Sequence, residues 1–174
     1  CVGNDDDLRE VTIGTNGAFS KIGKGSIFVD HTTVSTRVTK ELFDIGADSG
    51  FDFIDAPISG GQAGAENGLL SIMCGGSQRA FTKVQPVLKI YSKICKRIGE
   101  SGTGQQTKMC NQIAIAGLVQ GLSEALHFAE KAGLDGRDVV EVISQGAAGS
   151  WQMENRYETM PVSYTHLTLP TSSQ

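Results

Sequence analysis

Apolar residues recur at helical spacing through one long stretch of the chain, from Gln105 to Ala132. This stretch contains no proline, and its only glycines are Gly117 and Gly121. The pattern predicts a single helix roughly 40 Å long, at about 1.5 Å per residue. Gly133 fits the residue that ends such a helix, because glycine readily adopts the left-handed backbone conformation found there.

The buried face of this helix begins with polar side chains. Four apolar residues share one face and are expected to be buried: Ile115, Val119, Leu122 and Leu126. Lys108, Asn111 and Gln112 lie on the same face, one or two turns earlier. A lysine that loses contact with water has a lower pKa and can serve as a general acid or base. The alternative is a lysine that extends along the stripe to solvent, and the helix taken alone favours that interpretation.

The first hundred residues alternate between short apolar strands and helices. Strands are predicted over residues 26–30, 51–56, 69–74 and 94–98, and helices over residues 5–13, 36–46 and 78–92. Residues 5–7, Ser35 and Ser77 are predicted to cap these helices. Alternating strands and helices indicate a parallel sheet with crossover helices, so we expect an α/β fold.

Three loops follow predicted strands at the carboxyl edge of this sheet, where ligands bind in folds of this kind. They contain Val2, Gly3 and Asn4 in the first loop, His31, Thr32 and Thr33 in the second, and residues 57–61 in the third. Ser59, Gly60 and Gly61 offer a hydroxyl and backbone N–H groups with little side-chain bulk, which suits close contact with a carboxylate. The alternative is an ordinary glycine-rich turn.

The chain changes character near residue 100, from a sheet with helices to helices alone. We expect one domain over residues 1–100 and the first part of an all-helical domain over residues 101–160, entered through the long helix. Asp135 and Ser150 are predicted to cap two further helices. Two helices and part of a third cannot enclose the long apolar stripe, so we expect the helical part to need more chain, a partner subunit or both.

The last residues differ in composition from everything before them. Residues 161–171 read PVSYTHLTLPT and show no periodicity. This run resembles the translated read-through of a sequencing adapter, so we expect residues 161–174 not to belong to the natural protein. The alternative is an ordinary flexible carboxyl terminus.

Composition narrows the possible functions. The chain has 174 residues, of which 39% are hydrophobic, and this is enough for one domain or somewhat more. Its formal net charge of −4 argues against a nucleic-acid partner. No apolar run approaches the length that spans a bilayer, so we expect no membrane association.

The cysteines and histidines show no metal-ligand spacing, so no metal site is expected. Cys74, Cys95 and Cys110 are predicted to be small buried residues in a reducing compartment.

Several motifs, taken together, resemble the β-hydroxyacid dehydrogenase family, which includes 3-hydroxyisobutyrate and tartronate semialdehyde dehydrogenases. Residues 55–61, followed by Ala65 and Gly68, resemble the family's substrate-binding signature. Residues 102–111, with Lys108, resemble its catalytic signature. Residues 29–34 resemble the strand-end segment that lies along the cofactor, and residues 1–4 resemble a cofactor loop that usually reads Leu-Pro-Asp. The likeness extends in order to about residue 160.

The resemblance implies a Rossmann-type domain joined to an all-helical domain by the long helix, with homodimers or homotetramers formed through the helical parts. It implies hydride transfer between NAD or NADP and a small β-hydroxy acid, giving the semialdehyde. Lys108 would be the acid/base. Substrate would be bound by Ser59, Gly60, Gly61, Asn111 and Gln112, and the cofactor by Val2, Gly3, Asn4, Thr32 and Thr33. A cytoplasmic location is implied, or the mitochondrial matrix in a eukaryote.

The chain departs from the family pattern in three places. Some relatives carry asparagine where this chain has Gln112, so the role of that position is shared with Asn111 or moved to it. The family's Gly-rich GxGxxG fingerprint belongs before Cys1, and the rest of the helical domain belongs after residue 160. We therefore expect an internal fragment that is inactive as it stands. NAD cannot be told from NADP, because the discriminating residue also belongs before Cys1.

Three alternative functions remain. An enzyme of the 6-phosphogluconate type would be expected to show basic phosphate-binding residues and a decarboxylation site, which this sequence lacks. A non-catalytic NAD(P)-binding module that serves oligomerisation would typically have lost the lysine, whereas Lys108 is present. An inactive truncated product would describe this chain and not its parent protein.

Overall fold

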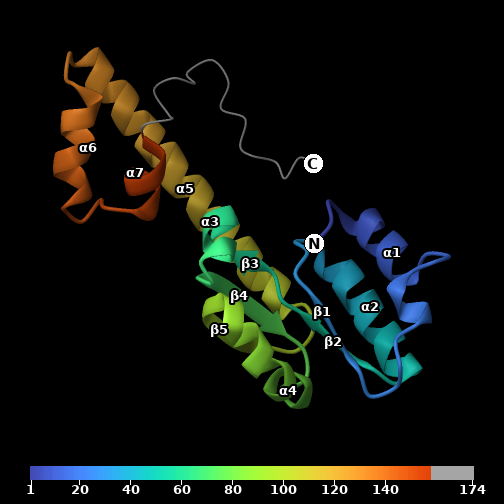
Figure 1. Cartoon of the computed structure of the whole chain (residues 1–174). Helices are drawn as coiled ribbons and strands as arrows, with labels where there is room; N and C mark the ends of the chain where they lie inside the picture. The colour runs from blue at the N-terminus through green and yellow to red at the C-terminus, as the bar shows by residue number, and fades with distance from the viewer. Residues whose placement is uncertain (158–174) are drawn as a thin grey trace. The chain divides into compact units, whose positions relative to one another are not determined.

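The computed structural model describes residues 1–157 and shows an α/β protein (Figure 1). The chain divides into two compact units, one spanning residues 1–110 and the other beginning at Asn111. A single helix, α5 (Thr103–Lys131), runs through both units. The predicted long helix is therefore confirmed, with its start two residues earlier than the apolar pattern indicated.

The first unit is built on one five-stranded sheet. Its strands are β1 (Ile27–Asp30), β2 (Asp52–Asp55), β3 (Ile58–Ser59), β4 (Leu70–Gly75) and β5 (Ser92–Gly99). They follow the order β1-β2-β4-β3, with β5 also paired to β4. The Rossmann-type α/β fold is confirmed, and the pairs β1·β2 and β4·β5 are parallel as predicted.

The sheet is mixed and not wholly parallel, because β4 runs antiparallel to both β2 and β3. The reason is the length of the connection. Only residues 60–69 link β3 to β4, and a parallel pairing needs a crossover of about a dozen residues or more. The chain therefore turns back on itself, and β2 with β3 lies along β4.

The helices of the first unit mostly follow the sequence pattern. They are α1 (Asp5–Ile13), α2 (Thr36–Ser49), α3 (Gly61–Glu66) and α4 (Gln78–Leu88), with short 3-10 helices at Ala18–Ser20 and Lys89–Tyr91. Ser35 and Ser77 cap α2 and α4, as predicted. The predicted cap of α1 was wrong by one residue, because the side chain of Asn4 accepts the capping hydrogen bonds and the acidic residues 5–7 form the first turn. Helix α3 was not predicted.

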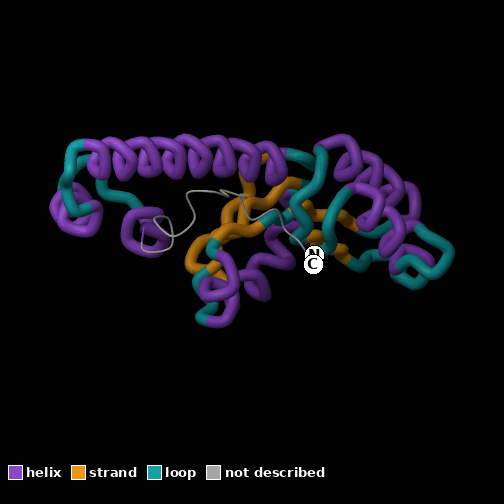
Figure 2. The backbone as a smooth tube through the Cα atoms, turned by 90° about the horizontal axis from the view of Figure 1, so that it is seen from above, coloured by secondary structure: helices purple, strands orange, loops and turns teal. Residues whose placement is uncertain are grey.

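Helices cover both faces of the sheet (Figures 1 and 2). Neighbouring residues of β2 point to opposite faces, as they must in a strand. On one face Phe53 packs in a cluster with residues of α1 and α2: Leu8, Val38 and Leu42. On the other face Ile54 packs in a cluster with residues of α4: Ala80, Phe81 and Leu88. All of these side chains are buried, so β2 contributes to the core on both faces of the sheet.

The second unit is helical. Besides α5 it contains α6 (Gly136–Ser144) and α7 (Trp151–Arg156), which are capped by Asp135 and Ser150 as predicted. Gly133 adopts a left-handed φ of +72°, and the Leu134 N–H binds the Ala129 carbonyl oxygen, which ends α5 as expected. The unit's buried cluster comprises Leu122, Leu126, Val140 and Met153.

Two predictions about single residues of the long helix need qualification. Of the predicted stripe, Leu122 and Leu126 are buried, whereas Ile115 and Val119 are only half-buried. Cys110 is exposed, so its predicted burial was wrong; it lies next to Met109, which is also exposed, and not on the buried face of α5. Cys74 is buried as predicted.

The predicted adapter-derived tail, residues 161–174, lies outside the described residues. Within residues 1–157, no helix is both long and apolar enough to cross a membrane.

Gly104 marks the closest approach of α5 to the sheet. A Cβ at Gly104 would collide with the Met73 carbonyl oxygen and lie 2.8 Å from the Asp55 carbonyl oxygen. Because these are backbone atoms of packed strands, they cannot easily move away. We expect Gly104→Ala to lower the free energy of unfolding by about 1–3 kcal/mol, measured by urea denaturation.

The control for this prediction is Gly117→Ala, further along the same helix. A Cβ at Gly117 would meet no atom within 4 Å, so alanine should raise stability by about 0.5–1 kcal/mol through its better helix propensity. Equal stabilities for Gly104→Ala and the unsubstituted protein would contradict the close packing described above.

Candidate active site

The amino end of α5 is held by a carboxylate from the sheet. Asp55 ends β2 and is fully buried. Its Oδ1 accepts a hydrogen bond from the Gly102 N–H at 2.8 Å, and its Oδ2 accepts one from the Gln105 N–H at 3.1 Å. These N–H groups have no partner within the helix, and a negative charge there also interacts favourably with the helix dipole. Asp55 therefore fixes where α5 begins.

Burial and hydrogen bonding act on Asp55 in opposite directions. Burial raises the pKa of this carboxyl, and the N–H groups of Gly102 and Gln105 lower it, with burial the larger effect. Sequence reasoning quoted Asp55 within a motif but gave it no role. The available signal was a carboxylate at the end of an apolar strand, and its partners lie 47 and 50 residues further along the chain.

Lys108 lies on the part of α5 that packs against the sheet. Its Nζ donates a hydrogen bond to the Ile58 carbonyl oxygen at 2.7 Å. The side chain is half-buried, and burial lowers the pKa of its amine. The acceptor is held firmly, because β3 pairs with β4 and the Met73 N–H binds the Pro57 carbonyl oxygen. The lysine is therefore not free in solvent, and it forms no ion pair with any residue of the described range 1–157.

The structure places the predicted carboxylate-binding loop directly beside this lysine contact. Ser59 follows Ile58 on β3 and is half-buried. Gly60 and Gly61 have φ values of +137° and +61°, which disfavour any residue with a side chain. Both glycines are exposed. The loop thus presents a hydroxyl and accessible backbone next to Lys108, and its role in binding a carboxylate stays a prediction.

The two amides predicted to bind substrate bind each other. Asn111 Nδ2 donates a hydrogen bond to Gln112 Oε1 at 2.9 Å. They lie three and four residues after Lys108 on α5, the spacing that puts side chains on the same side of a helix. Their partnership with Lys108 in binding a substrate stays a prediction.

The predicted cofactor residues come together in part. The Val2 N–H donates to Thr32 Oγ1 at 3.3 Å, which joins the first loop to the segment after β1. Thr32 is buried and Thr33 is exposed. Asn4 differs from the others, because its side-chain oxygen already accepts the N–H groups of Asp6 and Asp7 as the cap of α1. Gly3 and Thr33 are exposed, but the Gly3 N–H already donates to Asp7 Oδ2 at 3.2 Å. The Thr33 hydroxyl and the Gly3 carbonyl oxygen are groups of a kind that suits the amide and ribose of a nicotinamide nucleotide.

Two further polar residues shape the segment after β1, and the sequence analysis placed both in that segment without giving either a role. Asp30 is buried; its Oδ1 accepts the Thr32 N–H at 2.9 Å, and its Oδ2 has no hydrogen-bond partner among the described residues. His31 Nδ1 lies 2.6 Å from the Ala56 carbonyl oxygen and Nε2 lies 2.9 Å from the Tyr91 hydroxyl. A carbonyl oxygen only accepts, so Nδ1 carries a proton and the neutral ring can accept from Tyr91.

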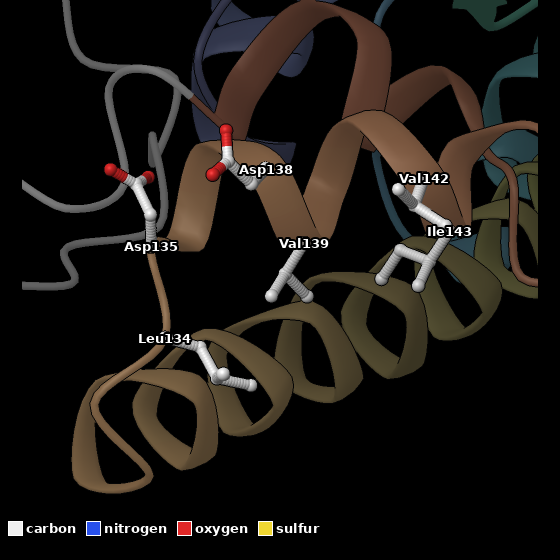
Figure 3. Close-up of a pocket in the computed structure, with 6 residues that line it drawn as sticks. All are labelled: Leu134, Asp135, Asp138, Val139, Val142 and Ile143. Atoms are coloured by element: carbon white, nitrogen blue, oxygen red, sulfur yellow. The ribbon is translucent and has the colours of Figure 1, made fainter.

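A pocket in the helical unit is a poor candidate for an anionic substrate. It has a volume of about 370 Å³ and is lined by Leu134, Asp135, Asp138, Val139, Val142 and Ile143 (Figure 3). Its charged groups are two carboxylates, which would repel a hydroxy acid. Within residues 1–157, no group of three or more His, Cys, Asp or Glu side chains could hold a metal ion.

The buried carboxyl of Asp30 should make stability depend on pH. Burial raises its pKa above the usual 3.8, so the folded protein holds the proton more tightly than the unfolded chain. Its contribution to stability is complete below about pH 3.8 and declines as the pH rises through the raised pKa. Asp30→Asn keeps an acceptor for the Thr32 N–H and cannot ionise. We expect the unfolding free energy of Asp30→Asn, minus that of the unsubstituted protein, to increase as the pH rises from about 3.5 to 7.

The measurement is urea denaturation at several pH values, with Asp48→Asn on the exposed side of α2 as the matched control. If the difference in unfolding free energy between Asp30→Asn and the unsubstituted protein stays constant across the whole pH range, the pKa of Asp30 is not raised in the folded protein.

Comparisons with known proteins cover nearly the whole described chain. Residues 1–99 match the family model described as the NAD binding domain of 6-phosphogluconate dehydrogenase. Residues 102–166 match the one described as the NAD-binding region of NADP-dependent 3-hydroxyisobutyrate dehydrogenase. These matches confirm the predicted cofactor class, NAD or NADP.

Individual relatives agree with these matches. The chain is 58% identical to an uncharacterised oxidoreductase of Shewanella frigidimarina, over 92% of this chain and 55% of that protein. It is 39% identical to the 2-hydroxy-3-oxopropionate reductase of Escherichia coli, over 88% of this chain and 52% of that protein. A crystal structure of 3-hydroxyisobutyrate dehydrogenase from Salmonella typhimurium is similar with a TM-score of 0.78 and 31% identity, covering 90% of this chain and 55% of that one.

The chain thus spans about half the length of the relatives it matches. Two consecutive family models match in the order in which the sheet and the long helix follow each other in the structure. Lys108, the glycine-containing loop that includes Ser59 and the segment after β1 all lie within these matched residues. The chain belongs to the β-hydroxyacid dehydrogenase family.

Proposed function

We propose that the protein is an oxidoreductase that transfers hydride between NAD or NADP and a small β-hydroxy acid similar to 3-hydroxyisobutyrate, giving the semialdehyde. The observation that carries the proposal is the half-buried Lys108, whose Nζ lies 2.7 Å from the Ile58 carbonyl oxygen beside the Ser59–Gly61 loop. Two relatives, a 2-hydroxy-3-oxopropionate reductase and a 3-hydroxyisobutyrate dehydrogenase, support this substrate class by their names.

Lys108 acts as the acid/base of the reaction. In the oxidation direction its neutral Nζ takes the proton of the substrate hydroxyl as the carbinol C–H bond breaks and the C=O bond forms. A base works best when its pKa is near the working pH, and burial moves the pKa of this amine in that direction. The Ile58 carbonyl oxygen holds the amine in place until the substrate hydroxyl replaces it as a partner.

The substrate carboxylate is bound by the loop next to the lysine. Ser59 supplies a hydroxyl, and Gly60 and Gly61 supply backbone N–H groups that no side chain shields. Asn111, one turn after Lys108 on α5, orients the substrate with the help of Gln112. The distance between Lys108 and the loop that binds the carboxylate is fixed by the fold. This arrangement therefore favours hydroxy acids of one length, whose hydroxyl reaches Lys108 while the carboxylate is bound.

The cofactor is held by residues 2–4 and by Thr32 and Thr33. When bound, its nicotinamide ring accepts or gives the hydride. Val2 and Thr32 are joined by a hydrogen bond, so the two segments form one surface, with Thr33 exposed upon it. The homodimer or homotetramer, the cytoplasmic or mitochondrial-matrix location and the inactivity of these 174 residues by themselves stay predictions, and the proposal makes no choice between NAD and NADP.

Lys108→Ala tests the proposal, in the protein at the length its gene encodes. Removing the acid/base should lower kcat with a β-hydroxy acid by about 10²–10⁴-fold. The dissociation constant of the reduced cofactor, followed by its fluorescence, should change little, because the lysine is assigned to the substrate and not to the cofactor.

Lys131→Ala is the matched control, since Lys131 is an exposed lysine in the last turn of the same helix. It should leave kcat and cofactor binding unchanged. Full turnover in Lys108→Ala would end the assignment of Lys108 and, with it, the proposed mechanism.

A further inference from the structure

Gln105 is a buried amide that binds the backbone of a segment more than seventy residues away in sequence. It lies in the first turn of α5, and its side chain is fully buried. Its Nε2 donates to the Thr32 carbonyl oxygen at 2.7 Å, and its Oε1 accepts the Val34 N–H at 3.2 Å. The amide therefore binds the chain on both sides of Thr33, as a neighbouring strand would.

The segment needs such a partner because residues 31–35 belong to no helix or strand. A buried backbone N–H or carbonyl group without a hydrogen bond is strongly unfavourable. Gln105 satisfies one group of each kind. It thereby leaves Thr33 exposed between two fixed residues.

The same residue is also fixed to the sheet through its own backbone. The Gln105 N–H binds Asp55 Oδ2 at 3.1 Å, and Thr32 is bound through its N–H to Asp30 Oδ1 at 2.9 Å. Asp30 and Asp55 are paired neighbours on the parallel strands β1 and β2. Two adjacent strand ends, the segment after β1 and the start of α5 are thus joined in one closed, buried set of hydrogen bonds.

We propose that Gln105 is a positioning residue that holds residues 32–34 in the conformation that receives the nicotinamide cofactor, and in register with the helix that carries Lys108. The inference rests on the proposed function, because it takes Thr32 and Thr33 as cofactor-binding residues. Gln105 itself touches neither cofactor nor substrate. Its effect is to remove conformational freedom from the segment before the cofactor arrives.

The chemistry requires a side chain that donates and accepts at the same time. Methionine has a similar shape and does neither to a useful extent. A glutamate with an ionised carboxylate can accept from Val34 and would repel the Thr32 carbonyl oxygen. The same glutamate when protonated has one O–H donor and one free acceptor, so it can restore both hydrogen bonds.

The first experiment compares Gln105→Met with Gln106→Met in the protein at the length its gene encodes. Gln106 is the exposed neighbour on the same turn and serves as the matched control. The readout is the dissociation constant of the reduced cofactor, from fluorescence titration. Gln105→Met should bind the cofactor about five- to tenfold more weakly, because the segment must be ordered on binding, and Gln106→Met should match the unsubstituted protein.

The second experiment uses the pH dependence of Gln105→Glu as a rescue. Other titratable groups near this position are Asp55 at the end of β2, Asp30 at the end of β1, His31 beside Thr32, the amino terminus and Lys108 on α5. All of them are present both in Gln105→Glu and in the unsubstituted protein. The ratio of the cofactor dissociation constant of Gln105→Glu to that of the unsubstituted protein therefore isolates the effect of the introduced carboxyl. Burial should raise the pKa of this carboxyl. At about pH 5.5 the carboxyl should be protonated, and this ratio should approach one. By about pH 8 the carboxyl should be ionised, and the ratio should rise about five- to tenfold.

The outcomes separate this inference from the function on which it rests. If the unsubstituted protein binds neither NADH nor NADPH, the proposed function fails and takes the positioning role with it. If it binds cofactor and Gln105→Met binds equally well, or if the Gln105→Glu ratio is independent of pH, only the positioning role is overturned. A Gln105→Met variant that fails to fold leaves the decision to the Gln105→Glu ratio.

Discussion

The buried carboxylate of Asp55 at the start of α5 is the interaction on which the rest of the site depends. A fully buried charge is unfavourable unless hydrogen bonds compensate for lost water. Here the N–H groups of Gly102 and Gln105 compensate for part of that loss, at a helix end whose dipole favours negative charge. The strand end and the helix start therefore stabilise each other, and neither can shift without leaving the other unsatisfied. Lys108 takes its position from this contact.

Parallel pairing of β1 and β2 explains why the proposed cofactor segment lies close to the helix start. Asp30 and Asp55 are neighbours in register, and each ends its strand with a buried carboxyl. Asp30 accepts a hydrogen bond from the Thr32 N–H, and Asp55 accepts hydrogen bonds at the start of α5. Gln105 connects the two places, because its side chain binds the Thr32 carbonyl oxygen. The proposed hydride-transfer site is thus built from two adjacent strand ends, the general location of ligand sites in open α/β sheets.

Much of this arrangement could be predicted from local sequence. The limits of α5 follow from apolar periodicity and from Gly133, and Ser35, Ser77, Asp135 and Ser150 were recognisable as caps. The motif around Lys108 and the Ser59–Gly61 loop identified the family, which the comparisons confirm. These features depend on residues close together in the chain, so a pattern of spacing is enough to find them.

Other features depend on contacts between distant residues and could not be predicted in this way. The strand pattern of residues 70–75 is the same for parallel and antiparallel pairing, so the direction of β4 followed only from the short link before it. Nothing local to Asp55 or Gln105 reveals partners 47 to 73 residues away. Asn4 differs from these residues, because the capping contacts of its side chain with Asp6 and Asp7 are local. Its assignment to the cofactor, made by resemblance, stays a prediction.

The central claim is that Lys108 meets the hydroxyl of a β-hydroxy acid beside a nicotinamide held by residues 32–33. The most direct test is a crystal structure of the protein, at the length its gene encodes, with a β-hydroxy acid and NAD or NADP bound. The account predicts the substrate hydroxyl oxygen within about 3.2 Å of Lys108 Nζ, in place of the Ile58 carbonyl oxygen. A substrate bound elsewhere, with Lys108 still on Ile58, would contradict it.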